Sequence, residues 1–198
     1  MSYLMMAIGD GNAVATKAVV DAVEPYMTAA GATSIRGSAI LTGANTGKSL
    51  VSSVWDNPDG YFEKRATWLA DPKVVEVFQA AGTTSTQVTM AEITAERGTC
   101  EGKYGVGIWQ TGTDFSQSSV DQVVDAVEAA MIGQGANGLR TTRLLTGENT
   151  GMALGVFFVD SLADFFGTLP KLLDDPDVVA GFQRAGLVTH VRSITQTI

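Results

Sequence analysis

The chain contains one sequence pattern twice. The six residues 19–24, with the sequence VVDAVE, recur letter for letter at residues 123–128, which is 104 positions later. At the same offset, residues 42–82 and 146–186 share 17 identical pairs among 41 positions. Unrelated chains of ordinary composition would share about 2 to 3 such pairs. The two halves are therefore copies of one ancestral unit.

Each copy is about 95 residues long, which is the size of a small domain. Two copies of that length are too few and too long for a solenoid of stacked repeats. We therefore expect two homologous domains, residues 1–96 and residues 104–198. Residues 97–103 contain two glycines and show no hydrophobic periodicity, so we interpret them as the linker.

The two copies predict the same order of elements. Short apolar runs at residues 3–8 and 104–109 are typical of strands, and each precedes apolar residues at helical spacing. A Thr-Gly-x-Asn-Thr-Gly element then separates two further apolar runs in each copy, and its glycine and asparagine favour a hairpin turn. A helical segment and a last apolar run complete each copy, so the predicted order is β-α-β-β-α-β, twice.

This order predicts an α+β fold with two tandem ferredoxin-like units. In such a unit, helical crossovers flank a hairpin, and both helices cover one face of an antiparallel sheet. Apolar side chains point to both faces of the strand at residues 152–159, which indicates that the sheet is also covered on its second face. Two such sheets in one chain can cover each other. We therefore expect the two sheets to pack into an intramolecular α/β barrel.

The helical segment before the last strand is split in both copies. Each copy has an Asp-Pro pair followed by Phe-Gln-x-Ala-Gly, at Asp71-Pro72 with residues 78–82 and at Asp175-Pro176 with residues 182–186. With these features the chain resembles the dimeric α/β-barrel superfamily over both halves, with two units fused in one chain. Members include antibiotic-biosynthesis-type monooxygenases, stress-responsive barrel proteins, haem-degrading enzymes and lactone isomerases. The resemblance implies a fold and a range of functions, because one fold hosts many activities.

Charge and composition exclude several classes of function. With 13 basic and 21 acidic residues the net charge is −8, which opposes binding to nucleic acid or anionic lipid. The single cysteine, Cys100, and the single histidine, His190, cannot form the clusters that zinc or iron-sulfur sites need, so we expect no metal and no cofactor. No apolar run is long enough to span a membrane, and the first residues lack the basic region of a secretion signal. We expect a cytoplasmic protein.

Three polar residues are candidates for catalysis. His190 lies in the last predicted strand, where it could act as an acid, a base or a haem ligand, although its place there favours a partly exposed strand histidine without function. Arg192 shares its face of that strand. Arg140 and its counterpart Arg36 lie in the second strand of each copy, where a guanidinium could hold an anion or could protect a sheet edge from unwanted pairing.

Aromatic residues are the candidates for a ligand pocket. Trp55, Trp109 and Phe157, together with Arg36, could line an apolar cavity that accepts a flat ligand. Ordinary core packing predicts the same aromatic residues.

Two functions remain open. The first is a cofactor-independent monooxygenase- or isomerase-like enzyme that acts on a small apolar or aromatic ligand, with His190 or an aspartate as acid or base and with Arg140 or Arg192 as the anion partner. The alternative is a non-catalytic module that binds a small molecule or assembles as a homo-oligomer. The copies differ at the paired positions 86/190 (Thr/His), 88/192 (Val/Arg) and 55/159 (Trp/Val). This divergence favours a specialised site but also fits neutral drift.

Overall fold

The computed structural model describes all residues, 1–198, and divides them into two units. Unit 1 comprises Met1–Glu92, Leu145–Glu148 and Gln196–Ile198. Unit 2 comprises Ile93–Leu144 and Asn149–Thr195. Each unit therefore contains most of one sequence repeat.

The elements of the first repeat follow the predicted order. They are β1 (Ser2–Asn12), a short 3-10 helix η1 (Ala13–Ala15), α1 (Thr16–Ala29), β2 (Ala32–Ile40), β3 (Lys48–Trp55), α2 (Asp59–Leu69), α3 (Pro72–Ala80) and β4 (Thr86–Gly98). Strand β4 includes Arg97 and Gly98, so these two residues of the predicted linker are extended strand. This end of β4 belongs to unit 2, where the Arg97 guanidinium contacts Asp125 and Glu128.

The second repeat has the same series of elements. They are β5 (Tyr104–Thr111), α4 (Gln117–Met131), β6 (Gly138–Leu144), β7 (Ala153–Val159), α5 (Leu162–Asp174), α6 (Pro176–Ala185) and β8 (Val188–Thr197). No helix of the structure has both the length and the apolar character that a membrane span requires.

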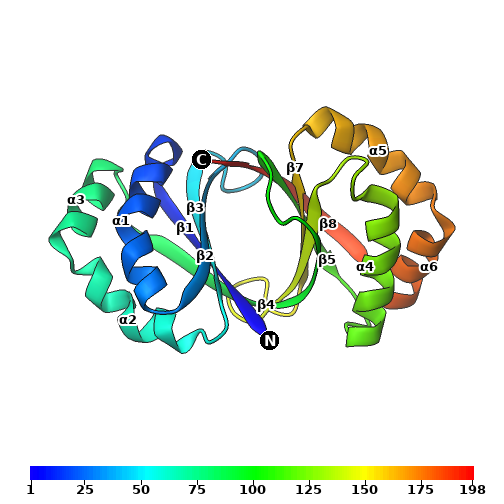
Figure 1. The fold of residues 1–198 in the computed structure, drawn as a ribbon, viewed down its shortest axis with the longest axis horizontal. Coiled ribbons are helices and arrows are strands. Elements are labelled where there is room, and N and C mark those ends of the chain that lie inside the picture. The colour runs from blue at the N-terminus through cyan, green and yellow to red at the C-terminus, as the bar shows by residue number, and fades with distance from the viewer. The chain divides into compact units, whose positions relative to one another are not determined.

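Both units have the ferredoxin-like arrangement, as predicted. The strand order is β4-β1-β3-β2 in unit 1 and β8-β5-β7-β6 in unit 2. Helices α1, α2 and α3 cover one face of the unit 1 sheet, and α4, α5 and α6 cover one face of the unit 2 sheet (Figure 1). The fold class is therefore α+β with two ferredoxin-like units, while the packing of the sheets into one barrel stays a prediction.

The predicted turn and cap residues have the expected local geometry. In each hairpin the two glycines of the Thr-Gly-x-Asn-Thr-Gly element adopt positive φ, at Gly43 and Gly47 and again at Gly147 and Gly151. Asp71 caps α3 by accepting a hydrogen bond from the Lys73 backbone N–H, and Asp175 caps α6 in the same way. Proline in the first turn of each helix loses no hydrogen bond, because that N–H has no partner within the helix.

Strand register shows which residues hold the same position in the two sheets. Ser53 of β3 lies opposite Met5 of β1, and Phe157 of β7 lies opposite Val106 of β5. The same two positions lie opposite Ile35 and Leu139 on the third strand of each sheet. Ser53 and Phe157 therefore occupy the same place in the two copies.

Candidate functional site

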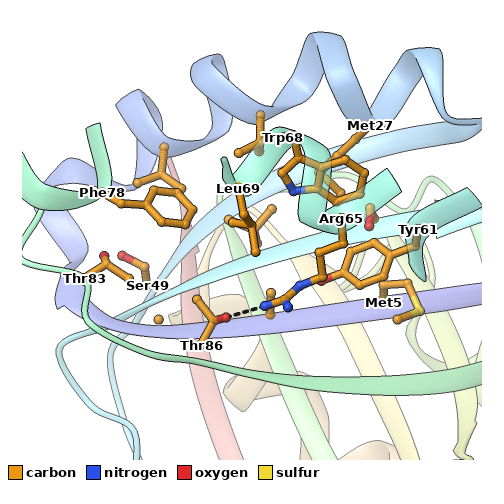
Figure 2. Close-up of a pocket in the computed structure, with 16 residues that line it drawn as sticks. Met5, Met27, Ser49, Tyr61, Arg65, Trp68, Leu69, Phe78, Thr83 and Thr86 are labelled. Carbon is orange, nitrogen blue, oxygen red and sulfur yellow. Dashed lines mark hydrogen bonds between the residues drawn. The ribbon is translucent and has the colours of Figure 1, made fainter. Parts of the chain in front are cut away.

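Unit 1 contains a pocket between the sheet and its helices. The floor is formed by side chains of β1, β3 and β4, and the roof by side chains of α1, α2 and α3 (Figure 2). The lining residues are Met5, Ala7, Gly9, Val19, Val23, Met27, Ser49, Val51, Ser53, Tyr61, Arg65, Trp68, Leu69, Phe78, Thr83 and Thr86. Most of them are apolar, with a few polar groups, which is the usual composition of a small-molecule site.

The pocket is small. Its cavity volume is about 50 Å³, whereas one water molecule needs roughly 10–15 Å³ in the same measure. The pocket therefore has room for about four water molecules, whereas a cavity known to bind benzene has a volume of about 150 Å³. A ligand with an aromatic ring therefore enters only if the helices over the pocket move outward.

Arg65 is the charged residue of the pocket. It extends from α2 toward the sheet, and its Nη2 donates a hydrogen bond of 2.7 Å to Thr86 Oγ1 (Figure 2). The ion pairs of Lys17, Arg97 and Arg140 involve other residues, and no carboxylate is paired with this half-buried guanidinium. A cation among apolar walls is costly without an anionic partner. The pocket therefore favours a ligand that carries negative charge.

Tyr61 contributes the second titratable group. Its ring packs edge-on against Trp55, with 5.7 Å between the ring centroids, and against Trp68 at 5.5 Å. Burial raises the pKa of the Tyr61 hydroxyl, and the neighbouring Arg65 guanidinium offsets part of that rise. Tyr61 is therefore a neutral phenol at neutral pH that can donate or accept a hydrogen bond.

Ser53 is the most buried polar residue of the pocket floor. Only 2% of its surface is exposed, and its Oγ accepts a hydrogen bond of 2.8 Å from Trp55 Nε1. Trp55 itself is fully buried beside the pocket and belongs to the core of unit 1. The two side chains share one face of β3, because they are two positions apart on the strand.

Unit 2 fills the equivalent space with apolar side chains. The counterparts of Ser53, Tyr61 and Arg65 are Phe157, Phe165 and Leu169, which all belong to one buried core cluster. The rings of Phe157 and Phe165 pack with 5.2 Å between their centroids. The difference between the two units thus arises from polar or smaller residues at positions that are apolar in unit 2.

A carboxylate secures one rim of the pocket. Asp10 Oδ1 accepts hydrogen bonds of 2.9 Å from the backbone N–H groups of Thr84 and Ser85, and Oδ2 accepts from both hydroxyls. These bonds, the one to the Thr84 hydroxyl most of all, hold the pKa of Asp10 well below its usual value. They immobilise the segment between Thr83 and Thr86, which both line the pocket.

The polar residues singled out from the sequence lie elsewhere. His190 and Arg192 are exposed on β8, and His190 Nε2 lies 2.8 Å from Thr111 Oγ1. Arg140 on β6 forms an ion pair with Glu96 on the neighbouring β4. The guanidinium therefore already has an anionic partner within the protein. None of these three lines the pocket of unit 1, and their catalytic role stays a prediction.

Of the aromatic residues proposed from the sequence, one lies beside the pocket and the others lie away from it. Trp55 adjoins the pocket through Ser53 and Tyr61, whereas Phe157 belongs to the unit 2 core. Trp109 and Arg36 are half-buried on β5 and β2, and neither lines the pocket.

Sequence reasoning missed Ser53, Tyr61, Arg65 and Thr86. The sequence does contain a signal for Arg65, because the second copy has Leu169 at the same position. A charged residue at a position that packs on the sheet is a difference between the copies that points to a site.

Haem, which some proteins of this fold use, does not fit this pocket. The cavity has room for about four water molecules, and no histidine, cysteine or methionine-histidine pair lines it. The single histidine hydrogen-bonds to a threonine on an exposed strand instead.

The comparisons with known proteins identify the fold. No protein family matches the sequence, and no curated protein does. Among solved structures, an anthrone oxidase-like protein has a TM-score of 0.61 at 14% identity, over 100% of this chain and 91% of the other. A monooxygenase-like protein from Listeria innocua has a TM-score of 0.51 at 13% identity, over 100% and 94%. A heme-binding protein from Thermus thermophilus has a TM-score of 0.59 at 8% identity, over 100% and 93%. The chain thus shares the ferredoxin-like fold of monooxygenase-like proteins.

Proposed function

We propose that this chain is a cofactor-independent monooxygenase- or isomerase-like enzyme that binds a small, largely apolar organic anion in the pocket of unit 1. The observation that carries the proposal is Arg65, a half-buried guanidinium in an apolar pocket without a carboxylate partner. The similarity in fold to monooxygenase-like and anthrone oxidase-like proteins supports the same reaction class.

The chemistry follows from the charge of Arg65. A fixed guanidinium stabilises negative charge that develops on a bound substrate, and it does so most strongly where water is excluded. Loss of a proton from an activated CH₂ group then gives a carbanion that dioxygen can oxidise. In that reaction CH₂ plus O₂ gives C=O plus H₂O, and the substrate supplies all the electrons. Return of the proton at another carbon instead gives an isomerisation.

The lining of the pocket also favours a second candidate, a non-catalytic module that binds a small anion. No carboxylate or imidazole lines the cavity, and the raised pKa of Tyr61 keeps it protonated at neutral pH. The enzyme would therefore rely on water as the base, whereas a binding module needs no base at all. Both candidates share the anion site at Arg65.

Titration calorimetry with benzoate tests the anion site. We expect the full chain to bind benzoate and the Arg65→Met variant to bind it at least about tenfold more weakly, because a charged hydrogen bond is worth roughly 1.5–3 kcal/mol. Lys17→Met is the matched control, since Lys17 is an exposed cation of the same unit that pairs with Asp21. Equal benzoate affinity in all three proteins would refute the anion site.

Turnover assays separate the two candidates. Oxygen uptake with cyclohexane-1,3-dione tests oxidation, and exchange of the α-protons of cyclohexanone in D₂O tests proton transfer. Acceleration by the wild type but not by Arg65→Met supports the enzyme. Benzoate binding without acceleration of either reaction supports the binding module.

A further inference from the structure

The hydroxyl of Ser53 carries a hydrogen that no residue accepts. Its oxygen accepts the Trp55 indole N–H, and the hydroxyl donates no hydrogen bond of its own within the protein. Buried polar groups in proteins are nearly always paired, and an unused buried donor costs free energy. Ser53 lines the pocket and is almost fully buried, so its hydrogen is available to a ligand in the cavity.

Ser49, on the same face of β3, differs in this respect. Its Oγ lies 2.8 Å from Thr16 Oγ1, from which it accepts, and it donates to the Asn12 carbonyl oxygen at 3.5 Å. Its hydrogen-bonding capacity is therefore used within the protein. Of the two serines in the pocket floor, Ser53 is therefore the one that can donate a hydrogen bond to a ligand.

Ser53 and the Arg65–Thr86 pair lie at opposite ends of the pocket. Ser53 is opposite Met5 on β1, whereas Thr86 lies beside Gly9, where the Asp10 N–H bonds to the Ser85 carbonyl. Four residues along β1 separate these two levels, which corresponds to roughly 13 Å. The two polar ends are joined by apolar walls.

We infer that Ser53 is a second ligand-binding residue, and that the ligand is a small elongated molecule with an anionic group at Arg65 and a hydrogen-bond acceptor at Ser53. A benzene ring with polar groups in para positions has this shape, and the helices over the pocket must move outward to admit it. The inference rests on the proposed anion site, and it deepens that proposal by assigning the far end of the ligand. Trp55 acts as a positioning residue, because its indole N–H occupies the Ser53 oxygen and turns the hydroxyl hydrogen away from itself.

Two probes of nearly equal shape test the inference. 4-Hydroxybenzoate carries an acceptor at the far end, and 4-methylbenzoate carries a methyl group of similar size there. We expect wild-type protein to prefer 4-hydroxybenzoate, and Ser53→Ala to weaken its binding by roughly 3- to 10-fold, the effect of one lost hydrogen bond. The affinity for 4-methylbenzoate should stay within twofold. Ser38→Ala is the control, since Ser38 is a buried serine of the same sheet that does not line the pocket.

Trp55→Phe tests the positioning role. This substitution keeps an aromatic ring in the core but removes the N–H. Altered packing can change both affinities, so the measured quantity is the ratio of the affinity for 4-hydroxybenzoate to that for 4-methylbenzoate. We expect this ratio to fall. A ratio that stays at the wild-type value would exclude the positioning role of Trp55. Thermal unfolding of each variant establishes that the protein is folded.

The outcomes separate this inference from the proposed function. If neither probe binds, the anion site itself is wrong. If both probes bind through Arg65 but Ser53→Ala leaves their ratio unchanged, the anion site stands and the role of Ser53 is refuted. The inference is supported if Ser53→Ala and Trp55→Phe lose the preference for 4-hydroxybenzoate over 4-methylbenzoate while Ser38→Ala keeps it.

Discussion

Trp55 Nε1 donates a hydrogen bond of 2.8 Å to Ser53 Oγ, the side chain two positions earlier on the same face of β3. In β7 of unit 2 the equivalent pair is Phe157 and Val159, both buried. The large aromatic side chain thus stands two positions further along the strand in unit 1. This shift leaves the space above Ser53 open, and the corresponding space in unit 2 holds the Phe157 ring.

Exchanging this pair should close the pocket of unit 1. We expect Ser53→Phe combined with Trp55→Val to abolish benzoate binding, because a phenyl ring would occupy the cavity as Phe157 does in unit 2. Thermal unfolding should change by only a few degrees, since the total apolar volume is nearly conserved. Calorimetry and a thermal melt measure the two effects. Unchanged benzoate affinity in the folded double variant would place the ligand elsewhere.

Truncating Phe157 should destabilise the protein. This ring is 5% exposed and packs on Phe165 in the core of unit 2. We expect Phe157→Ala to lower the free energy of unfolding by about 3–5 kcal/mol, the usual cost of deleting a buried phenyl ring. Urea unfolding measures the change. A loss below about 1 kcal/mol would show that this core is loosely packed.

Replacing each of two helical glycines by alanine should change the stability of the protein in opposite directions. A Cβ on Gly60 of α2 would lie 2.2 Å from the backbone oxygen of Ala30, so we expect Gly60→Ala to destabilise the protein by about 1–3 kcal/mol. A Cβ on Gly167 of α5 meets nothing within 4 Å, so Gly167→Ala should stabilise it by about 0.5–1 kcal/mol. Denaturant unfolding of both variants checks the signs. Equal effects would contradict the close contact between α1 and α2.

The Asp10 carboxylate should make stability depend on pH in acid. Its folded pKa is lowered, chiefly by the Thr84 hydroxyl, so its contribution is complete above the ordinary pKa of 3.8 and is lost as pH falls below that value. We expect Asp10→Asn to be less stable than wild type at pH 6, and the difference to shrink between pH 4 and pH 2. Urea unfolding at several pH values measures it. A difference that is constant with pH would mean that the carboxylate charge contributes nothing.

The fold could be predicted because its determinants are local or repeated. The hairpin glycines, the Asp-Pro caps of α3 and α6 and the alternation of β7 each act over a few residues. The second copy supplied an independent check on each of them. The boundaries of the linker stay a prediction; β4 continues through Arg97, which is attached to the helix α4 by ion pairs that only folding creates.

The candidate site was harder to predict for a physical reason. The order of elements, the turns and the caps follow from periodicity and backbone preference, which the amino-acid sequence alone determines. The pocket depends on side chains far apart in the chain, Ser53 on β3, Arg65 on α2 and Thr86 on β4, which meet only when helices pack on the sheet. Whether an aromatic ring fills a space or leaves it open is decided by that packing. Only the tertiary structure therefore decided that unit 1 keeps an open pocket around Arg65 while the equivalent space in unit 2 is a filled core.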